Sequence, residues 1–410
     1  MVKPQFSTLL VTLVLLSAFS GPLRAASEGE EIALLKAQVS QLSARLAELE
    51  ASSTRTEVAV ENLGEAFASA PQPSTAESLW ADRVKFSGNL RYRNEWIDVE
   101  DSKDRYRNRI RARLGASAKV LDSLTTHIQF ATGSDDPRST NQTLGGNFST
   151  KGIGLDLAYF DWDATDSLSV LGGKMKNPVV RPGQSRFIDG DITPEGVALA
   201  WNSGNFFALG SGYWGVERSS DDDTYALMLQ GGFKHTLDNG IGLTAAVSYT
   251  DWVNVKGFDP FYDGDPFGNS VGPDGNLIYD YDIVEGYGEV AFSLDERPLI
   301  FYAQYGVNTE ADNDDTAWSA GMTLGKTSGP GTWQLGYAYH DHEKDALFAQ
   351  VVDSDFADGQ TDVRGHVLTG SYAFSKAVGV SLSYFNNELD VSTTTKRDYQ
   401  RVMLDLNIKY

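Results

Sequence analysis

Alternation between apolar and polar residues runs from about residue 84 to the end of the chain, and it restricts the fold more than any other feature. Because successive side chains of a β-strand point to opposite faces, this alternation predicts strands with one apolar and one polar face. The segment 401–410 shows it most clearly, with apolar residues at every even position. We predict sixteen strands, near 84–99, 105–120, 124–133, 153–163, 167–176, 196–202, 205–217, 224–236, 241–252, 283–294, 299–309, 316–326, 332–342, 363–375, 378–389 and 398–410.

The connections between these segments fall into two sets. Every second connection is short, such as "NSGN" and "LDNG", whereas the others are mostly long and acidic, such as 253–282 and 343–362. A soluble barrel has no reason to sort its loops by end, but a transmembrane barrel has short periplasmic turns and long outer loops. We therefore predict an all-β protein in which residues 80–410 form a transmembrane antiparallel β-barrel of about sixteen strands. A barrel of this size leaves a water-filled channel.

Five arginines occupy every second position of "DRYRNRIRAR", residues 104–113, in a chain whose formal net charge is −22. On a strand all five share one face, and the opposite face is mostly apolar. Each would cost about 2–4 kcal/mol on the lipid side at mid-depth, so we expect them to face the lumen. Two arginines of the preceding strand have the matching parity. The predicted pore-lining residues are Arg91, Arg93, Arg105, Arg107, Arg109, Arg111 and Arg113.

These arginines allow two interpretations, which the sequence leaves open. A row of guanidinium groups in a wet lumen attracts anions and would favour their passage. Alternatively, the row pairs with acidic side chains of a loop that folds inward, which gives a braced and weakly selective constriction. The third outer loop, 177–195, is long enough to reach the lumen. Its charged candidates are Arg181, Arg186, Asp189, Asp191 and Glu195.

The first 79 residues differ from the rest of the chain. Residues 1–25 have a basic start, an apolar run and a small residue at the end, which is typical of a secretory signal peptide. Apolar residues spaced by three and four within 28–52 predict a short coiled coil. Residues 53–79 lose this spacing and contain two prolines among small polar residues, so they are predicted to be a linker. The chain has no cysteine, which excludes a disulfide scaffold or a thiolate site.

Several stretches resemble a known family. The runs "LRYRNEW", "RYRNRIRARLGASAKVLDSL", "ATGSDDPRSTNQTLGGNF", "LDLAYFDW" and "GGKMKNPVVRPG" are similar to the putative porin family of Gram-negative outer membranes. The resemblance covers roughly residues 84–410 and is densest in the first third. It implies a diffusion channel in the outer membrane, in contact with lipid and lipopolysaccharide, and a homo-oligomer for which a trimer is favoured. The C-terminal strand also resembles the assembly signal of such barrels, although it ends in Tyr410 where phenylalanine is commoner.

Other chemistry has little support in the sequence. No nucleophile motif or phosphate-binding loop occurs, so we expect neither an enzyme nor a cofactor. The acidic excess argues against nucleic acid as a partner. His340 and His342 in "HDHE" lack a third ligand, so we expect a solvated barrel rim there and no metal site. An alternative function is an envelope-organising protein whose barrel is mainly an anchor and whose coiled coil binds a periplasmic partner.

Overall fold

The computed structural model describes Lys36 and residues 82–410. The chain divides into two units, Met1–Glu77 and Ser78–Tyr410, and the description below concerns the second. The predicted signal peptide (1–25), the coiled coil (28–52, apart from Lys36) and the linker (53–79) lie outside the described residues. Within the described part of the chain, no helix has the length and hydropathy needed to cross a membrane.

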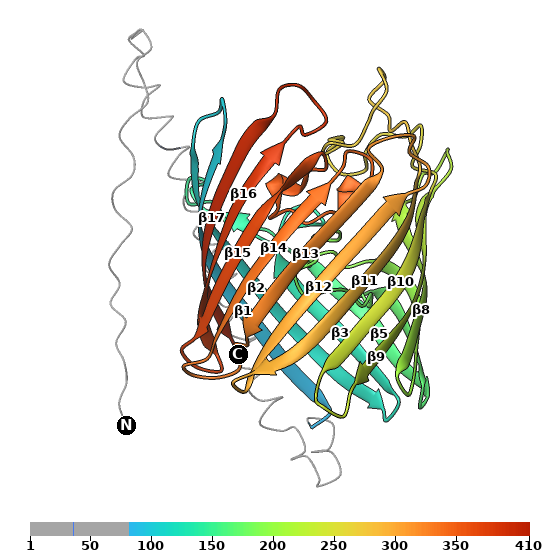
Figure 1. The fold of residues 1–410 in the computed structure, drawn as a ribbon, viewed down its shortest axis with the longest axis vertical. Coiled ribbons are helices and arrows are strands. Elements are labelled where there is room, and N and C mark those ends of the chain that lie inside the picture. The colour runs from blue at the N-terminus through green and yellow to red at the C-terminus, as the bar shows by residue number, and fades with distance from the viewer. Residues whose placement is uncertain (1–35, 37–81) are drawn as a thin grey trace. The chain divides into compact units, whose positions relative to one another are not determined.

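Residues 84–409 form one antiparallel sheet that closes into a barrel (Figure 1). Each long strand pairs with its neighbour in the chain, and β1 pairs with both β2 and β17. The strands are β1 (Val84–Val99), β2 (Arg105–Leu121), β3 (Leu124–Thr132), β4 (Gln142–Thr143), β5 (Ile153–Thr165), β6 (Leu168–Lys174), β7 (Glu195–Ser203), β8 (Phe206–Val216), β9 (Thr224–Thr236), β10 (Gly242–Val253), β11 (Tyr281–Leu294), β12 (Arg297–Asn308), β13 (Thr316–Gly325), β14 (Trp333–His342), β15 (Val363–Ala373), β16 (Val378–Leu389) and β17 (Arg397–Lys409).

Sixteen of these strands form the wall of the barrel, as the sequence predicts. The short strand β4 was not predicted; it lies within the loop 133–152 and pairs with β2. The barrel closes where β1 meets the chain end, because the backbone groups of Gly88 and Tyr410 exchange hydrogen bonds of 2.9 and 3.0 Å. Closure leaves no unpaired sheet edge in the wall, which a sheet that crosses lipid requires.

The two faces of the wall have the predicted difference in polarity. On the first two strands, large apolar side chains of one parity are exposed on the outside, among them Phe86, Tyr106 and Leu114. Side chains of the other parity point into the barrel, where the arginines of 107–113 are partly buried. Side-chain alternation along the strand therefore produces an apolar exterior and a charged interior.

The connections are long at one end of the barrel and short at the other (Figure 1). The shortest are two-residue turns, and in the turn between β11 and β12 both Asp295 and Glu296 have positive φ. This conformation matches the right-handed twist of a hairpin, so such turns join neighbouring strands compactly. The predicted sorting of connections by length is thus present in the structure.

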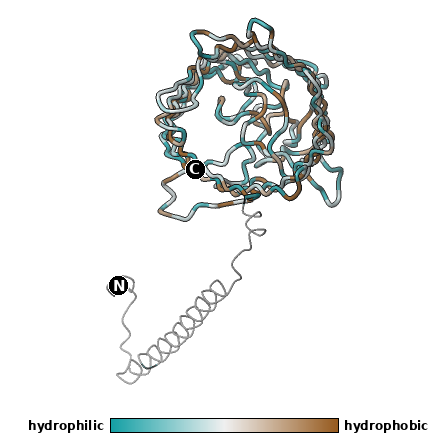
Figure 2. The backbone as a smooth tube through the Cα atoms, turned by 90° about the horizontal axis from the view of Figure 1, so that it is seen from below, coloured by the Kyte–Doolittle hydropathy of each residue, from teal (hydrophilic) through white to brown (hydrophobic). Residues whose placement is uncertain are grey.

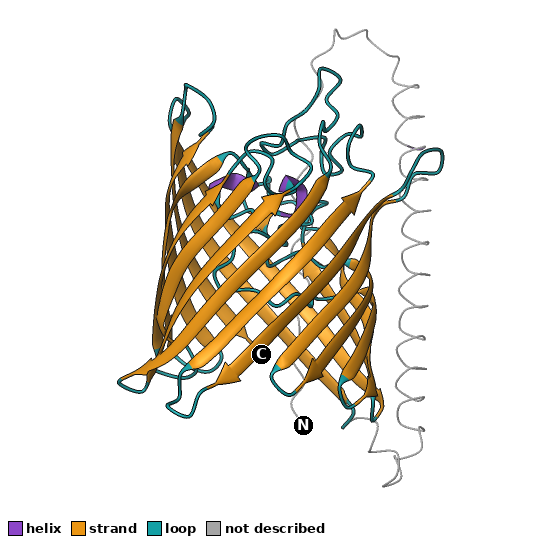
Figure 3. Ribbon diagram, turned by 45° about the vertical axis from the view of Figure 1, so that its right-hand side comes forward, coloured by secondary structure: helices purple, strands orange, loops and turns teal. Residues whose placement is uncertain are grey.

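Several long loops fold into the barrel and cross its interior (Figures 2 and 3). We call the two loops 175–194 and 343–362 the plug; the second contains the 3₁₀ turns η1 (Ala349–Val351) and η2 (Ala357–Gly359). Phe187, Leu347 and Phe348 of the plug pack against Tyr281 and Ile283 of β11. The barrel therefore has an apolar core at the level of the plug, although the sequence suggested only the first of these loops as an inward one.

Candidate constriction site

The arginines of β1 and β2 lie opposite one another on the inner wall. The register places Arg91 opposite Arg111, and Arg93 opposite Arg109. Like charges directly across from each other destabilise a sheet, so this surface needs anions between its guanidinium groups. We call it the arginine cluster; it comprises Arg91, Arg93, Arg107, Arg109, Arg111, Arg113 and, from β17, Arg401.

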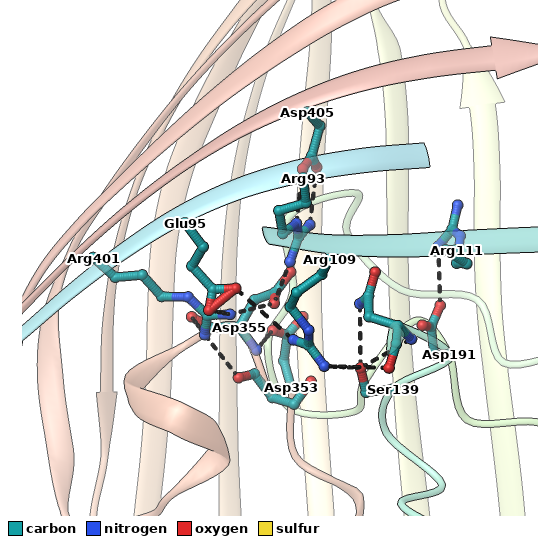
Figure 4. A network of polar contacts seen from close by, with 12 residues as sticks. Arg93, Glu95, Arg109, Arg111, Ser139, Asp191, Asp353, Asp355, Arg401 and Asp405 are labelled. Carbon is teal, nitrogen blue, oxygen red and sulfur yellow. Dashed lines mark hydrogen bonds and ion pairs between the residues drawn. The ribbon is translucent and has the colours of Figure 1, made fainter. Parts of the chain in front are cut away.

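The plug supplies one of these anions through Asp355 of loop 343–362 (Figure 4). Its Oδ1 lies 2.8 Å from Nη1 of Arg93 and 3.1 Å from Nη2 of Arg401. Both guanidinium groups are almost completely buried, and Arg93 also makes a bidentate contact with Asp405 of β17, at 2.7 and 2.9 Å. Arg401 further donates to the backbone carbonyls of residues 354 and 355, at 3.1 and 3.0 Å. These contacts fix loop 343–362 to the wall.

A wall carboxylate, Glu95 of β1, is completely buried among the same arginines. Its Oε1 accepts a hydrogen bond of 2.6 Å from Nε of Arg107 and lies 3.1 Å from Nη2 of Arg401. Arg109 approaches the other carboxylate oxygen at 3.8 Å. Glu95 therefore joins β1, β2 and β17 beneath the plug, and a buried carboxylate is tolerated here because three cations surround it.

The other plug loop reaches the cluster through Asp191. Its Oδ1 lies 3.0 Å from Nη2 of Arg113 and 3.6 Å from Nη1 of Arg111, and its Oδ2 accepts from the backbone and side chain of Thr140. Arg113 also approaches Asp156 of β5 at 3.6 Å. Loop 175–194 is thus fastened to the same wall as loop 343–362, but at a different point.

The two plug loops also bind each other. Arg186 pairs with Asp353 at 2.8 Å, and the backbone of Asp189 donates to the carbonyl of Val351 at 2.8 Å. The carboxylate of Asp189 in turn accepts from the backbone of Ser354 at 2.7 Å. These contacts make the plug a single cross-linked unit instead of two independent loops.

Burial and charge act in opposite directions on the carboxylates of the plug. Burial would raise the pKa of Asp355, but Arg93 and Arg401 hold this pKa well below its ordinary value. At Asp191, burial favours a higher pKa, whereas Arg113 and Arg111 favour a lower one. The net effect is a lowered pKa of Asp191. At Asp189, burial and the neighbouring Asp353 raise the pKa well above its ordinary value. Asp355 and Asp191, which face the arginine cluster, are therefore ionised at neutral pH, so their ion pairs with the arginines persist at that pH.

Not every predicted site residue takes part in these contacts. Arg91 binds the Asn141 side chain at 2.7 Å and has no ion pair among the described residues, and Arg105 is exposed near the outer end of β2. Arg181 donates to the backbone carbonyl of Ile188 within its own loop. Glu195 does not reach the cluster, because it begins β7 on the exposed side and pairs with a lysine of β6 at 2.9 Å.

Sequence reasoning missed the residues that neutralise the cluster from elsewhere in the chain. One signal was available for loop 343–362: its run "ALFAQVV" is apolar, which is unusual for a loop exposed to water. Among the described residues, six carboxylates come within 4 Å of the cluster, and all of them except the predicted Asp191 were missed. They are Glu95, Asp156, Asp191, Asp355, Asp358 and Asp405.

A cavity of about 640 Å³ lies between the plug, loop 133–152 and the opposite wall. Its lining combines carboxylates, such as Asp156 and Glu285, with aromatic side chains that include Tyr213 and Trp252. Glu285 contacts the Gln304 amide at 3.3 Å and has no ion pair among the described residues. The cavity therefore offers polar and aromatic surfaces to a small solute on the side of the lumen away from β1 and β17.

Comparison with known proteins agrees with this architecture. The model of the family described as "Putative porin" matches residues 96–261 and 275–410. The solved structure of OprB from Pseudomonas putida at high pH is similar, with 12% identity, coverage of 82% of this chain and 96% of that chain, and a TM-score of 0.57.

Two further solved structures match at lower TM-scores. A triple mutant of the Rhodopseudomonas blastica porin has 12% identity, coverage of 80% and 100%, and a TM-score of 0.47. A loop-deleted OmpT, an outer membrane protein of Vibrio cholerae, has 14% identity, the same coverage and a TM-score of 0.45. No curated protein matches the sequence significantly.

Proposed function

Because the chain belongs to the putative porin family, we propose that it forms an outer-membrane channel through which small hydrophilic solutes and ions diffuse passively. The observation that carries this proposal is a closed sixteen-stranded barrel with an apolar exterior and a charged interior that inward-folded loops narrow. Solutes would enter the 640 Å³ cavity, since the plug covers the wall that bears the arginine cluster.

Electrical recording tests this function directly. Purified full-length protein in a planar lipid bilayer is expected to produce stepwise current increases, because each inserted barrel adds one water-filled path. Deletion of residues 28–70 is expected to leave the step size unchanged, since the barrel begins after this segment. Silent bilayers with correctly folded barrels would contradict the channel. They would favour the alternative, in which the N-terminal segment tethers the membrane to a periplasmic partner and the barrel is an anchor.

We assign the arginine cluster mainly to holding the two plug loops against the wall of the barrel. Its contribution to anion preference is modest. Among the described residues, six carboxylates lie within ion-pair distance of six of its seven guanidinium groups, so little positive charge is left to attract anions. Water in the open part of the lumen screens what is left. Two arginines keep an uncompensated charge, Arg91 of the cluster and Arg105, which lies outside the cluster, because neither has an ion pair among the described residues.

Replacing Arg91 and Arg105 with glutamine is therefore expected to move the reversal potential in asymmetric KCl slightly towards cation preference. Lys119→Gln is a suitable control, because this lysine is half-exposed and pairs with Asp122 at the opposite end of β2. A double variant with the reversal potential of the wild type would exclude these two arginines from ion selection.

The predicted location and assembly extend the same proposal. A signal peptide at 1–25 would export the chain, and lipid and lipopolysaccharide would surround the apolar exterior. A trimer, with a coiled coil at 28–52 joining the protomers, is the assembly that we propose. Chemical cross-linking of membranes tests it, with the variant lacking 28–70 as the comparison.

A further inference from the structure

Two histidines of β14 are buried beneath the plug, contrary to the expectation of a solvated rim. His340 and His342 have no exposed surface, and their ring centroids lie 5.8 Å apart. None of the four ring nitrogens has a hydrogen-bond partner among the described residues. Among those residues, no third histidine or carboxylate joins them in an arrangement suited to a metal ion. Unpaired burial of polar groups costs free energy, so this histidine pair requires a physical explanation.

The histidine pair forms the surface on which both plug loops pack. The ring of Phe356, from loop 343–362, lies 5.1 Å from His340 and 5.2 Å from His342 between centroids. Phe187, from loop 175–194, approaches His342 edge-on at 5.3 Å. The loops therefore contact the wall through uncharged aromatic surfaces at this point, whereas they contact β1, β2 and β17 through ion pairs.

Among the described residues, the surroundings of the histidine pair contain a cation and no free anion. Arg186 of loop 175–194 is the charged group that acts on both rings, and its own partner is Asp353 of loop 343–362, at 2.8 Å. An imidazolium would therefore meet a like charge whose counter-ion is already engaged. The residues beside the pair on the neighbouring strands carry no charge: Ala317 and Ser319 on β13, Val363 and Gly365 on β15, and Asn387 beyond them on β16.

We propose that the histidine pair is an acid-sensitive latch: it holds the plug when both rings are neutral and releases loop 343–362 when they take up protons. The proposal rests on the packing of the pair against Phe356 and Phe187 and on the position of Arg186. With loop 343–362 displaced, water reaches both rings and solvates their charge. The lumen widens at the same time, so acidification opens the channel.

The direction and the steepness of the response follow from proton linkage. A histidine in water titrates near pH 6.5, so the released state binds protons below that pH while the closed state resists them. The neutral histidine pair therefore stabilises the closed state above about pH 6.5, and this stabilisation is lost as the pH falls below that value. Each ring shifts the closed-to-open ratio by up to about tenfold per pH unit, and the pair by up to about 100-fold.

Three carboxylates of the plug, those of Asp355, Asp191 and Asp189, do not produce this response. The pKa values of Asp355 and Asp191 are lowered, so their ion pairs persist until the pH falls below the ordinary range of an aspartate. The pKa of Asp189 is raised, so proton uptake there strengthens the closed state as the pH falls. An opening between pH 6.5 and 4.5 thus points to the histidine pair.

The test compares channel conductance at pH 7.5 and at pH 4.5 in symmetric KCl. Wild-type steps are expected to become larger at pH 4.5, and the double variant H340L/H342L is expected to keep the pH 7.5 step size at both values. H340Q/H342Q provides the same uncharged test if leucine disturbs the packing. H366L is the matched control, because His366 lies on the exposed face of β15 beside Tyr337, and it should respond to acid as the wild type does.

Hydrogen exchange gives a second measurement that does not depend on conductance, although the latch as an opening device rests on the proposed channel. In wild-type barrels in detergent, backbone amides of residues 346–359 are expected to lose protection at pH 4.5 after correction for the intrinsic exchange rate. They should stay protected in H340L/H342L. Equal protection at both pH values in the wild type, or equal loss in the double variant, would overturn the latch. Failure of the channel itself would appear as silent bilayers at pH 7.5.

Discussion

Asp355→Asn is expected to lower the free energy of unfolding of the barrel by about 3 kcal/mol and to make the single-channel current noisy. The substitution leaves Arg93 and Arg401 buried with one anion fewer, while both keep a second partner in Asp405 and Glu95. We therefore expect the lower end of the range for breaking a buried ion pair. Noise should increase because loop 343–362 loses the ion pairs of Asp355 with the wall and moves more freely in the lumen.

Denaturant unfolding in detergent and single-channel recording measure the two effects of Asp355→Asn. Glu388→Gln is the matched control, since Glu388 pairs with Arg364 in a half-exposed position at the end of β16. Exposed pairs contribute at most about 1 kcal/mol, so this control should leave both stability and noise nearly unchanged. If the two variants behave alike, Asp355 does not brace the plug.

Replacing residues 346–359 with a short glycine–serine connection is expected to give conductance steps several-fold larger than those of the wild type. This segment includes Leu347, Phe348 and Phe356, which fill the lumen at the level of the plug. Its removal leaves the strands intact, because β14 ends at His342 and β15 begins at Val363. The measurement is again the step size in symmetric KCl, with barrel formation checked by circular dichroism.

A similar replacement of residues 310–313 controls for loop shortening as such, and it keeps Asp314, whose carbonyl accepts a hydrogen bond of 2.8 Å from the backbone of Asp345 in the plug. These residues lie mostly exposed between β12 and β13, outside the apolar core that the plug forms. Their replacement should leave the step size unchanged. A loop 346–359 variant that conducts like the wild type would mean that another part of the lumen limits the current.

The wall of the barrel could be predicted from the sequence because each strand meets lipid on one side and the lumen on the other. This contrast leaves a period of two in the sequence, and it predicts an inward face for 105–113 without knowledge of any contact. The connections separate one strand from the next, so they give the number of strands, and their lengths show at which end of the barrel the long loops lie. The alternation and the connection lengths both depend on residues that are close together in sequence, so a single sequence is enough to recognise them.

The contacts of the site could not be predicted in the same way. Arg93 and Asp405 are 312 residues apart in sequence, and Arg401 and Glu95 are 306 apart. No local pattern relates such positions until the first and last strands are known to pair and their register is fixed. The burial of His340 follows from loop 343–362 turning inward, which tertiary packing decides. The apolar run in that loop was the one local sign of it.

The pairing of β1 with β17 also sets an order of events during assembly. The ion pairs between loop 343–362 and the wall come from these two strands, so the charged part of its docking surface is complete only when the final strand has been added. Contacts between positions more than 300 residues apart in sequence form slowly in such a topology. The ion pairs between the plug and the wall are therefore expected to form last, when the cylinder is already complete.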